Sequence, residues 1–300
     1  MNNSETKQMM SQYRDAIESY LEGVFPENSE DATVRAARYS LMVGGKRIRP
    51  ALMLMVADML GAEREFIMPF AAALEMIHTY SLIHDDLPCM DNDELRRGMP
   101  TCHIRYGEAT ALLAGDLLLN SAYEILLEQA ITHGSYAALA GRFMAKSAGG
   151  VGMIGGQSLD ISSFSGSVTL ERLEEIQRKK TGALLTAAIL TPFYASDNHH
   201  SNKELCVALT DYASHLGLSF QIKDDILDVE SSPEVLGKSI GKDAACDKAT
   251  FVTVCGIESS QKRLSEEYDA AYNALNSIKN LGFDNELLLS FTDYLRGRTN

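Results

Sequence analysis

Apolar residues recur at helical spacing along almost the whole chain, and no stretch of useful length alternates apolar and polar residues as a half-buried strand does. Only seven prolines interrupt its 300 residues. We therefore expect an all-α fold. Because no long linker, low-complexity tract or repeat of fixed period divides the sequence, we expect one large helical domain over residues 1–300.

Ten helices are predicted from this periodicity, separated by clusters of glycine, proline and serine. Their expected ranges are 7–24, 31–42, 50–60, 66–86, 107–132, 136–149, 170–194, 202–229, 259–279 and 285–296. Breaks are expected at Gly44 and Gly45, at Pro88, at Gly98 to Pro100, at Gly155 and Gly156, at 162–167 and at 231–243. Bundles of this kind place their ligand sites between the inner faces of facing helices.

The charge balance limits the possible partners. The chain has 41 acidic and 27 basic side chains, which excludes a general nucleic-acid binder, because such a protein needs a basic face. A small anionic ligand stays possible if a few cations converge or a metal ion intervenes. Five cysteines without a C-x-x-C pair favour a reducing compartment. With no signal-peptide core at the start and no apolar run of membrane-spanning length, we expect a cytoplasmic protein without membrane insertion.

The strongest functional signal is a pair of aspartate-rich segments in apolar surroundings. The first segment, Ile83–Asp91, contains Asp85, Asp86 and Asp91 at the end of a strongly apolar predicted helix. On an unbroken helix, Asp85 and Asp91 would point roughly 120° apart. Pro88 disfavours continuation of the helix, and the resulting bulge could return Asp91 to the side of Asp85.

The second segment, Gln221–Asp228, lies inside another apolar predicted helix. Its residues Asp224 and Asp228 are one turn, roughly 6 Å, apart on one face. Buried carboxylates are costly unless a cation compensates them. A solvated helix end explains one such segment about equally well, but it explains two of them poorly. Oxygen ligands and incomplete protein coordination favour magnesium that also binds phosphate.

Short basic runs accompany these carboxylates. The runs are Gly44–Pro50, Arg96–Gly98 and Arg178–Gly182. Each run alone is most often a solubilising surface, and only the pairing with acidic metal sites favours a diphosphate ligand. His78 lies seven residues before Asp85 on nearly the same helical face, so we expect it to contact ligand rather than to fill the core.

Five runs together resemble the trans-prenyl diphosphate synthases in order and spacing, from about Ala36 to Phe251. The runs are Gly44–Pro50, Asp85–Gly98, Gly155–Asp160, Lys180–Gly182 and Gln221–Asp228. The four residues Leu87–Met90 between the outer aspartates resemble the bacterial and plant form of this family. The sequence departs from the family pattern in two places: Phe251 and Val252 stand where Tyr-Pro is common, and no lysine ends the chain after Arg298.

The resemblance implies an isoprenoid synthase fold, a single polyprenyl synthetase domain around a central cavity, three Mg²⁺ ions and a homodimer. By position, the isopentenyl diphosphate site would comprise Lys46, Arg49, His78 and Arg97. The main metal ligands would be Asp85, Asp91 and Asp224, supported by Asp86, Asp225 and Asp228. The allylic diphosphate would contact Arg96, Lys180 and Lys238. The oxygen dipoles of Thr181 and Gln221 would steady the developing allylic cation.

The resemblance also implies the reaction. Dimethylallyl and geranyl diphosphate would be elongated with isopentenyl diphosphate, with release of diphosphate. Tyr80 lies roughly 7.5 Å before Asp85 along the helix, and its ring could close the cavity floor. An ordinary core aromatic is the alternative for this residue. In the resembling family an aromatic residue here accompanies a fifteen-carbon product, so farnesyl diphosphate is expected.

Four alternatives stay open. The nearest is a geranylgeranyl diphosphate synthase, which product analysis would separate. A terpene cyclase is disfavoured because the second segment here is rich in aspartate rather than of the Asn/Ser/Glu type. A non-catalytic helical partner subunit of a prenyl synthase would be expected to have lost motif residues. A simple metal-binding bundle would not explain Lys46, Arg49, Arg96, Arg97 and Lys180.

Overall fold

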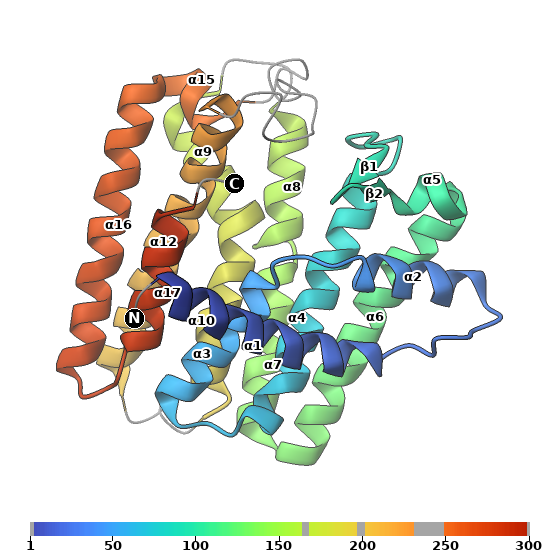
Figure 1. The fold of residues 1–300 in the computed structure, drawn as a ribbon, viewed down its shortest axis with the longest axis horizontal. Coiled ribbons are helices and arrows are strands. Elements are labelled where there is room, and N and C mark those ends of the chain that lie inside the picture. The colour runs from blue at the N-terminus through green and yellow to red at the C-terminus, as the bar shows by residue number, and fades with distance from the viewer. Residues whose placement is uncertain (1–2, 164–167, 197–201, 231–248, 299–300) are drawn as a thin grey trace. The chain divides into compact units, whose positions relative to one another are not determined.

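The computed structural model describes residues 3–163, 168–196, 202–230 and 249–298, and these are almost entirely helical (Figure 1). The chain divides into two units. The unit that we call N-terminal contains Lys7–Ala145 and Thr191–Asp197. The unit that we call C-terminal contains Met1–Thr6, Lys146–Leu190 and Asn198–Asn300. The predicted all-α class is confirmed.

The N-terminal unit is built around two apolar helices, α3 and α4, which pack on each other and are buried over most of their length. Helix α6 packs along α4, and a two-residue hairpin follows the end of α4 (Figure 1). The elements are α1 (Asn3–Glu22), α2 (Ala32–Met42), α3 (Ile48–Leu60), α4 (Arg64–Asp85), β1 (Leu95–Arg96), β2 (Met99–Pro100), α5 (Cys102–Tyr106), α6 (Glu108–His133) and α7 (Ser135–Ala148).

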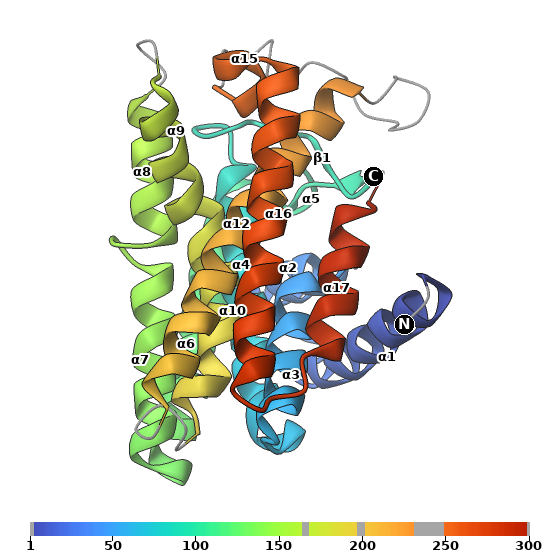
Figure 2. The ribbon, with the colours of Figure 1, turned by 90° about the vertical axis from the view of Figure 1, so that its left-hand side faces the viewer.

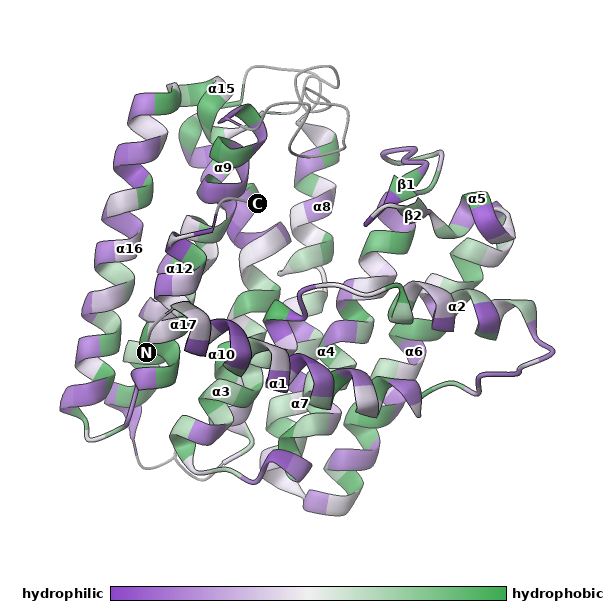
Figure 3. Cartoon of the chain, in the orientation of Figure 1, coloured by the Kyte–Doolittle hydropathy of each residue, from purple (hydrophilic) through white to green (hydrophobic). Residues whose placement is uncertain are grey.

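The C-terminal unit is organised around the long helix α12, which lies beside α16 in both views (Figures 1 and 2). Figure 3 shows hydrophilic residues along much of α16, whose buried face points to α12. The elements are α8 (Met153–Ser162), α9 (Leu170–Gln177), the π-helical turn η1 (Arg178–Gly182), α10 (Ala183–Tyr194), α12 (Lys203–Glu230), α15 (Phe251–Cys255), α16 (Ile257–Asn280) and α17 (Glu286–Arg296).

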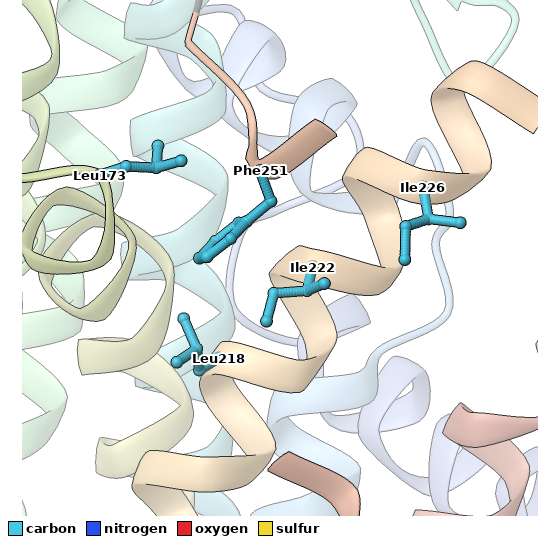
Figure 4. Close-up of a cluster of buried hydrophobic side chains, with 5 residues drawn as sticks. All are labelled: Leu173, Leu218, Ile222, Ile226 and Phe251. Carbon is cyan, nitrogen blue, oxygen red and sulfur yellow. The ribbon is translucent and has the colours of Figure 1, made fainter. Parts of the chain in front are cut away.

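A small apolar cluster fixes α15 and α9 to α12. Its buried members are Leu173, Leu218, Ile222, Ile226 and Phe251 (Figure 4). Three of them are spaced by four residues along α12, so they form one stripe on that helix. The side chain of Phe251 points towards this stripe. The packing places the backbone of residue 251 directly beside the second aspartate-rich segment.

Three sequence expectations differ from the structure. The predicted break at Gly155 and Gly156 is wrong, because both glycines lie inside α8: a Cβ at Gly156 would overlap the backbone of Lys180 in η1, and a Cβ at Gly155 would overlap the carbonyl of Gly150 in the preceding turn. The predicted helix 170–194 is interrupted by the π turn η1. The short helices α5 and α15 were not predicted, since five residues are too few for a periodic apolar pattern.

Two helices are long and apolar enough to cross a membrane by length and composition alone. In α4, 72% of the apolar window is buried within the protein, as expected for a core helix. In α6 only 33% of the window is buried, so this helix presents apolar side chains on its surface. Core helices pass the same length and composition test, which is weak evidence for membrane insertion.

A buried ion pair joins α3 to α4. Arg47 has a left-handed backbone (φ 47°) at the start of α3, and its side chain is fully buried. Its Nη1 donates to Glu75 Oε1 at 2.7 Å, and its Nη2 donates to the carbonyl of Leu41 at 2.6 Å. The loop that carries Lys46 is thus tied to the core by the residue that follows it.

We expect Glu75→Ala to lower the free energy of unfolding by about 3 kcal/mol, the lower end of the range for breaking a buried pair, because the Arg47 charge would keep the more distant and partly exposed carboxylate of Glu18, 3.5 Å from its Nε. Chemical denaturation measures this loss. The surface pair of Arg14 and Asp15, 3.1 Å apart, provides the control, and Asp15→Ala should change stability by no more than about 0.5 kcal/mol. Equal effects of the two substitutions would contradict a stabilising role for the buried pair.

Candidate functional site

The first aspartate-rich segment folds back on itself at the end of α4. The helix ends at Asp85, and the chain turns at Pro88, as predicted. The backbone N–H of Asp91 donates to the carbonyl of Asp85 at 2.8 Å. The turn therefore brings these two aspartates next to each other, and both side chains are only partly buried.

The middle aspartate of this segment is held by the hairpin. Only 3% of the Asp86 side chain is exposed, and Arg96 of β1 binds it as a fork, with Nε 2.8 Å from both carboxylate oxygens. Burial raises the pKa of Asp86, while the Arg96 guanidinium acts in the opposite direction. The pair anchors the hairpin to α4, and it places Arg96 against the segment that carries Asp85.

Cations of the N-terminal unit gather around His78. Nη1 of Arg49 donates to His78 Nε2 at 3.3 Å. Burial lowers the pKa of His78 well below its ordinary value, and the charges of Arg49, Arg97, Arg96 and Arg47 lower it further, in that order. His78 is therefore neutral near pH 7, in a region of positive potential that suits an anionic ligand.

The glycine loop before α3 lies against one of these cations. Nη1 of Arg97 donates to the carbonyl of Gly44. A Cβ at Gly45 would lie 2.6 Å from the same nitrogen, and its φ of 147° also disfavours a side chain. Lys46, the next residue, is exposed. The structure thus brings the loop that carries Lys46 together with Arg97, and Arg49 together with His78, all within one unit.

Tyr80, the predicted chain-length residue, is buried one turn before His84 on α4. Its ring meets the His84 ring edge-on, with centroids 5.7 Å apart and an interplanar angle of 81°. Burial raises the pKa of its hydroxyl. Among the described residues, that hydroxyl has no hydrogen-bond partner.

In the C-terminal unit, the π turn η1 carries Lys180 and Thr181. Nζ of Lys180 is 2.6 Å from Oδ2 of Asp160 on α8. One turn earlier on α8, a Cβ at Gly156 would lie 2.2 Å from the backbone nitrogen of Lys180. Gly156 therefore lets the turn approach α8, and Asp160 then holds the ammonium group.

A chain of hydrogen bonds connects Thr181 to α12 and α15. Its hydroxyl donates to Gln221 Oε1 at 3.0 Å, and Gln221 Nε2 donates to Asp225 Oδ1 at 2.9 Å. The other carboxylate oxygen of Asp225 accepts from the backbone N–H of Phe251 at 2.8 Å. The buried Asp225 thus fixes the side-chain amide of Gln221, and Gln221 in turn fixes the hydroxyl of Thr181.

The two remaining aspartates of this segment reach the surface of α12. Asp224 has 41% of its side chain exposed and accepts a hydrogen bond from Nη2 of Arg298. The Arg298 guanidinium also lies over the Phe220 ring, 4.6 Å from its centroid. Asp228, one turn further on, is exposed. Lys238, the remaining predicted ligand of the allylic diphosphate, lies outside the described residues.

The carboxylates of the two segments fit a magnesium ion that completes its coordination with oxygens of a bound phosphate compound. Within the described ranges, no group of three or more His, Cys, Asp and Glu side chains could hold a metal by itself. Mg²⁺ is typically bound by one or two carboxylates together with phosphate oxygens rather than by an all-protein cage. The adjacent Asp85 and Asp91, and the surface pair Asp224 and Asp228, supply carboxylates of this kind.

Sequence reasoning missed three contributors to the site. Gly156 and Asp160 lie in a run that was noted but given no role, and their spacing of four residues on one helical face could have indicated a shared contact. No signal in the sequence placed Arg298 against Asp224, because the two residues are 74 positions apart.

Comparisons with known proteins show the family to which the chain belongs. The family model described as Polyprenyl synthetase matches residues 30–281. The chain is 42% identical over 274 residues to a farnesyl diphosphate synthase of Haemophilus influenzae, covering 91% of this chain and 92% of the relative. It is 42% identical over 293 residues to a geranylgeranyl diphosphate synthase of Cyanophora paradoxa, covering 96% and 94%.

One solved structure is a geranyltransferase of Helicobacter pylori in complex with magnesium and isoprenyl diphosphate. It superimposes with a TM-score of 0.80 at 30% identity, over 99% of this chain and 97% of that one. The predicted isoprenoid synthase fold is confirmed by this similarity.

We expect Gly156→Ala to destabilise the protein by about 1–3 kcal/mol, because the new methyl group would overlap the backbone of Lys180. Thermal or chemical unfolding measures the change. Gly150→Ala is the matched control in the same unit, since nothing lies within 4 Å of a Cβ there. A Gly156 variant as stable as the control would contradict the close approach of α8 and η1.

We expect the wild-type protein to lose stability as the pH falls below about 6.5, the ordinary pKa of histidine. The unfolded chain binds a proton at His78 there, whereas the folded protein does not, because the folded pKa is lowered. This contribution is present above pH 6.5 and is lost progressively towards the lower folded pKa. Denaturation curves at pH 7 and pH 5 give the difference in the free energy of unfolding between the two pH values, and His78→Gln should make this difference smaller. A variant with the same difference as the wild type would contradict the role given to His78.

Proposed function

Because the chain belongs to the polyprenyl synthetase family and is a prenyltransferase of isoprenoid biosynthesis, we propose that it makes farnesyl diphosphate. Dimethylallyl and geranyl diphosphate are its allylic substrates, isopentenyl diphosphate is the elongating substrate, and diphosphate is released. The observation that supports this best is the arrangement of the N-terminal unit. In this unit the turn that brings Asp85 and Asp91 together lies at the end of α4, and a cluster of arginines surrounds His78 on the same helix. The two carboxylates suit a metal ion, and the arginines suit a second anion that binds without metal.

The cationic cluster binds isopentenyl diphosphate in this proposal. Arg49 and Arg97 donate to its phosphate oxygens, and Lys46 adds a point charge from the exposed end of the glycine loop. Neutral His78 donates or accepts a hydrogen bond there without adding charge to the cluster. The similarity to farnesyl diphosphate synthases supports this assignment, as does the order of the motif residues.

The aspartates hold magnesium and, through it, the allylic diphosphate. Asp85, Asp91 and Asp224 are the main ligands, and Asp86, Asp225 and Asp228 support them, for three ions in total. The Helicobacter pylori structure, solved with magnesium and isoprenyl diphosphate, supports this choice of metal. When bound, Mg²⁺ supplies Lewis-acid stabilisation of the negative charge on the departing diphosphate.

The reaction begins when the C–O bond of the allylic diphosphate breaks and leaves an allylic cation. Lys180, aligned by Asp160, and Arg96 and Lys238 stabilise the leaving diphosphate. The Thr181 hydroxyl donates to Gln221, so its lone pairs are available to face the cation. The double bond of isopentenyl diphosphate then attacks, and a proton is lost to the released diphosphate. The residues around the site exclude water, which would otherwise capture the cation.

A geranylgeranyl product is the second candidate, because the Cyanophora paradoxa relative is equally identical to this chain. The buried aromatic ring of Tyr80 favours the shorter product. A non-catalytic role as a partner subunit is disfavoured, because the sequence retains the acidic and basic residues of all five motif runs. Chromatography of the product formed from isopentenyl and dimethylallyl diphosphate decides among the three.

We further propose that the chain forms a homodimer in the cytoplasm through the surface of α6. This surface exposes Leu112, Leu113, Leu127 and Ile131, with 47 to 79% of each residue accessible. Such a patch is typical of a protein interface. A second copy of the chain would cover it, and a solution mass equal to one chain would exclude this assembly. Cell fractionation tests the location.

We expect Asp85→Asn and Asp224→Asn each to lower kcat at least about hundredfold, or about 2.7 kcal/mol in barrier, because each removes a charge that binds the metal. Magnesium-dependent release of diphosphate measures the rate. Asp211→Asn, at an exposed position of the same helix α12, is the control and should keep full activity. Near-normal rates in either aspartate variant would reject its assignment as a ligand.

A further inference from the structure

His84 lies between Tyr80, the predicted chain-length residue, and Asp85 on α4, and its ring fits a space that a glycine leaves open. Gly115 is in the middle of α6, which packs along α4. A Cβ at Gly115 would lie 2.1 Å from His84 Nε2 and 2.5 Å from its Cδ2. No other residue type leaves room at this position for the ring as it is placed.

A hydrogen bond holds the ring in that space. Nε2 of His84 is 3.0 Å from the carbonyl oxygen of Leu112, one turn before Gly115 on α6. A carbonyl only accepts, so Nε2 carries the proton and donates. The two features together fix where the ring lies, because the bond sets its direction and the missing side chain sets its depth.

His84 in turn packs against Tyr80. The two residues are four positions apart on α4, so their side chains share a face, and the rings meet edge-on. Among the described residues, the Tyr80 hydroxyl finds no hydrogen-bond partner although it is buried. Packing alone therefore fixes the Tyr80 ring, and the His84 ring is an aromatic part of that packing.

We propose that His84, held by the Leu112 carbonyl in the space left by Gly115, is a positioning residue that fixes the ring of Tyr80 and thereby limits product length. This rests on the proposed function, in which Tyr80 closes the floor of the substrate cavity. His84 does not touch the growing chain in this account. It acts by preventing the Tyr80 ring from turning aside as the chain lengthens.

The test measures the ratio of twenty-carbon to fifteen-carbon product made by the purified full-length protein from isopentenyl and dimethylallyl diphosphate. We expect His84→Ala and Gly115→Ala each to raise this ratio about tenfold, which corresponds to about 1.4 kcal/mol of relative barrier. Gly141→Ala on α7 is the matched control, because a Cβ there would meet Leu126 Cβ at an ordinary 3.4 Å. Its product ratio should equal that of the wild type.

A double-substitution cycle shows whether His84 acts through Tyr80. Tyr80→Ala alone should lengthen the product, and adding His84→Ala to it should change the ratio no further, because the ring to be positioned is gone. Independent effects that multiply in the double variant would overturn the proposal. His84→Phe keeps an aromatic ring without the hydrogen bond, so it should restore part of the fifteen-carbon preference that His84→Ala loses.

The remaining outcomes also decide the question. A His84→Ala protein that is slower but has an unchanged product ratio would show that His84 serves the neighbouring Asp85, and the proposal would be wrong. If Gly115→Ala does not fold, the His84 variants and the cycle still give the answer. A wild-type protein that forms no prenyl product would refute the proposed function itself, which the product ratio of the variants does not address.

Discussion

The rest of the structure depends on one constraint, which is that a carboxylate taken out of water must be given hydrogen bonds. Each aspartate-rich segment contains one such group. Asp86 is bound by the fork of Arg96, and Asp225 accepts from Gln221 and from the backbone of Phe251. Because adjacent residues of a helix point about 100° apart, fixing the second aspartate of each pair turns the first one outward. The buried acids are therefore the framework on which the exposed acids are oriented.

Close packing at glycines is the second device, and it appears at three places near the functional side chains. Gly156 admits the turn with Lys180, and Gly217 lies against Gly182, where a Cβ would be 3.2 Å from the Gly182 Cα. Gly115 makes room for a side chain instead, the ring of His84. A glycine inside a helix costs roughly 0.5–1 kcal/mol relative to alanine. The tight packing that each glycine permits offsets that cost.

The sequence predicted the helical class, most helix positions and the turn after Asp85, because these follow from apolar periodicity and from proline. It also singled out the aspartates and the cations that the structure groups within each unit, such as Arg49 with His78. It did not predict that Gly156 continues a helix, because the reason for this glycine is the backbone of Lys180, more than twenty residues away. The contacts of Arg298 and Asp160 were missed for the same reason, since a pairing between distant segments leaves no local pattern.

The π turn η1 has a consequence for how the chain can vary. A turn of this type contains one residue more than the α-helical turns on either side of it. Deleting that residue would make 170–194 a continuous α-helix and leave α9 and α10 in nearly the same phase, because the π turn takes up its extra residue within a single turn. The inserted position therefore changes the direction in which the side chains of the turn itself project, Lys180 and Thr181 among them, rather than the alignment of the two helices.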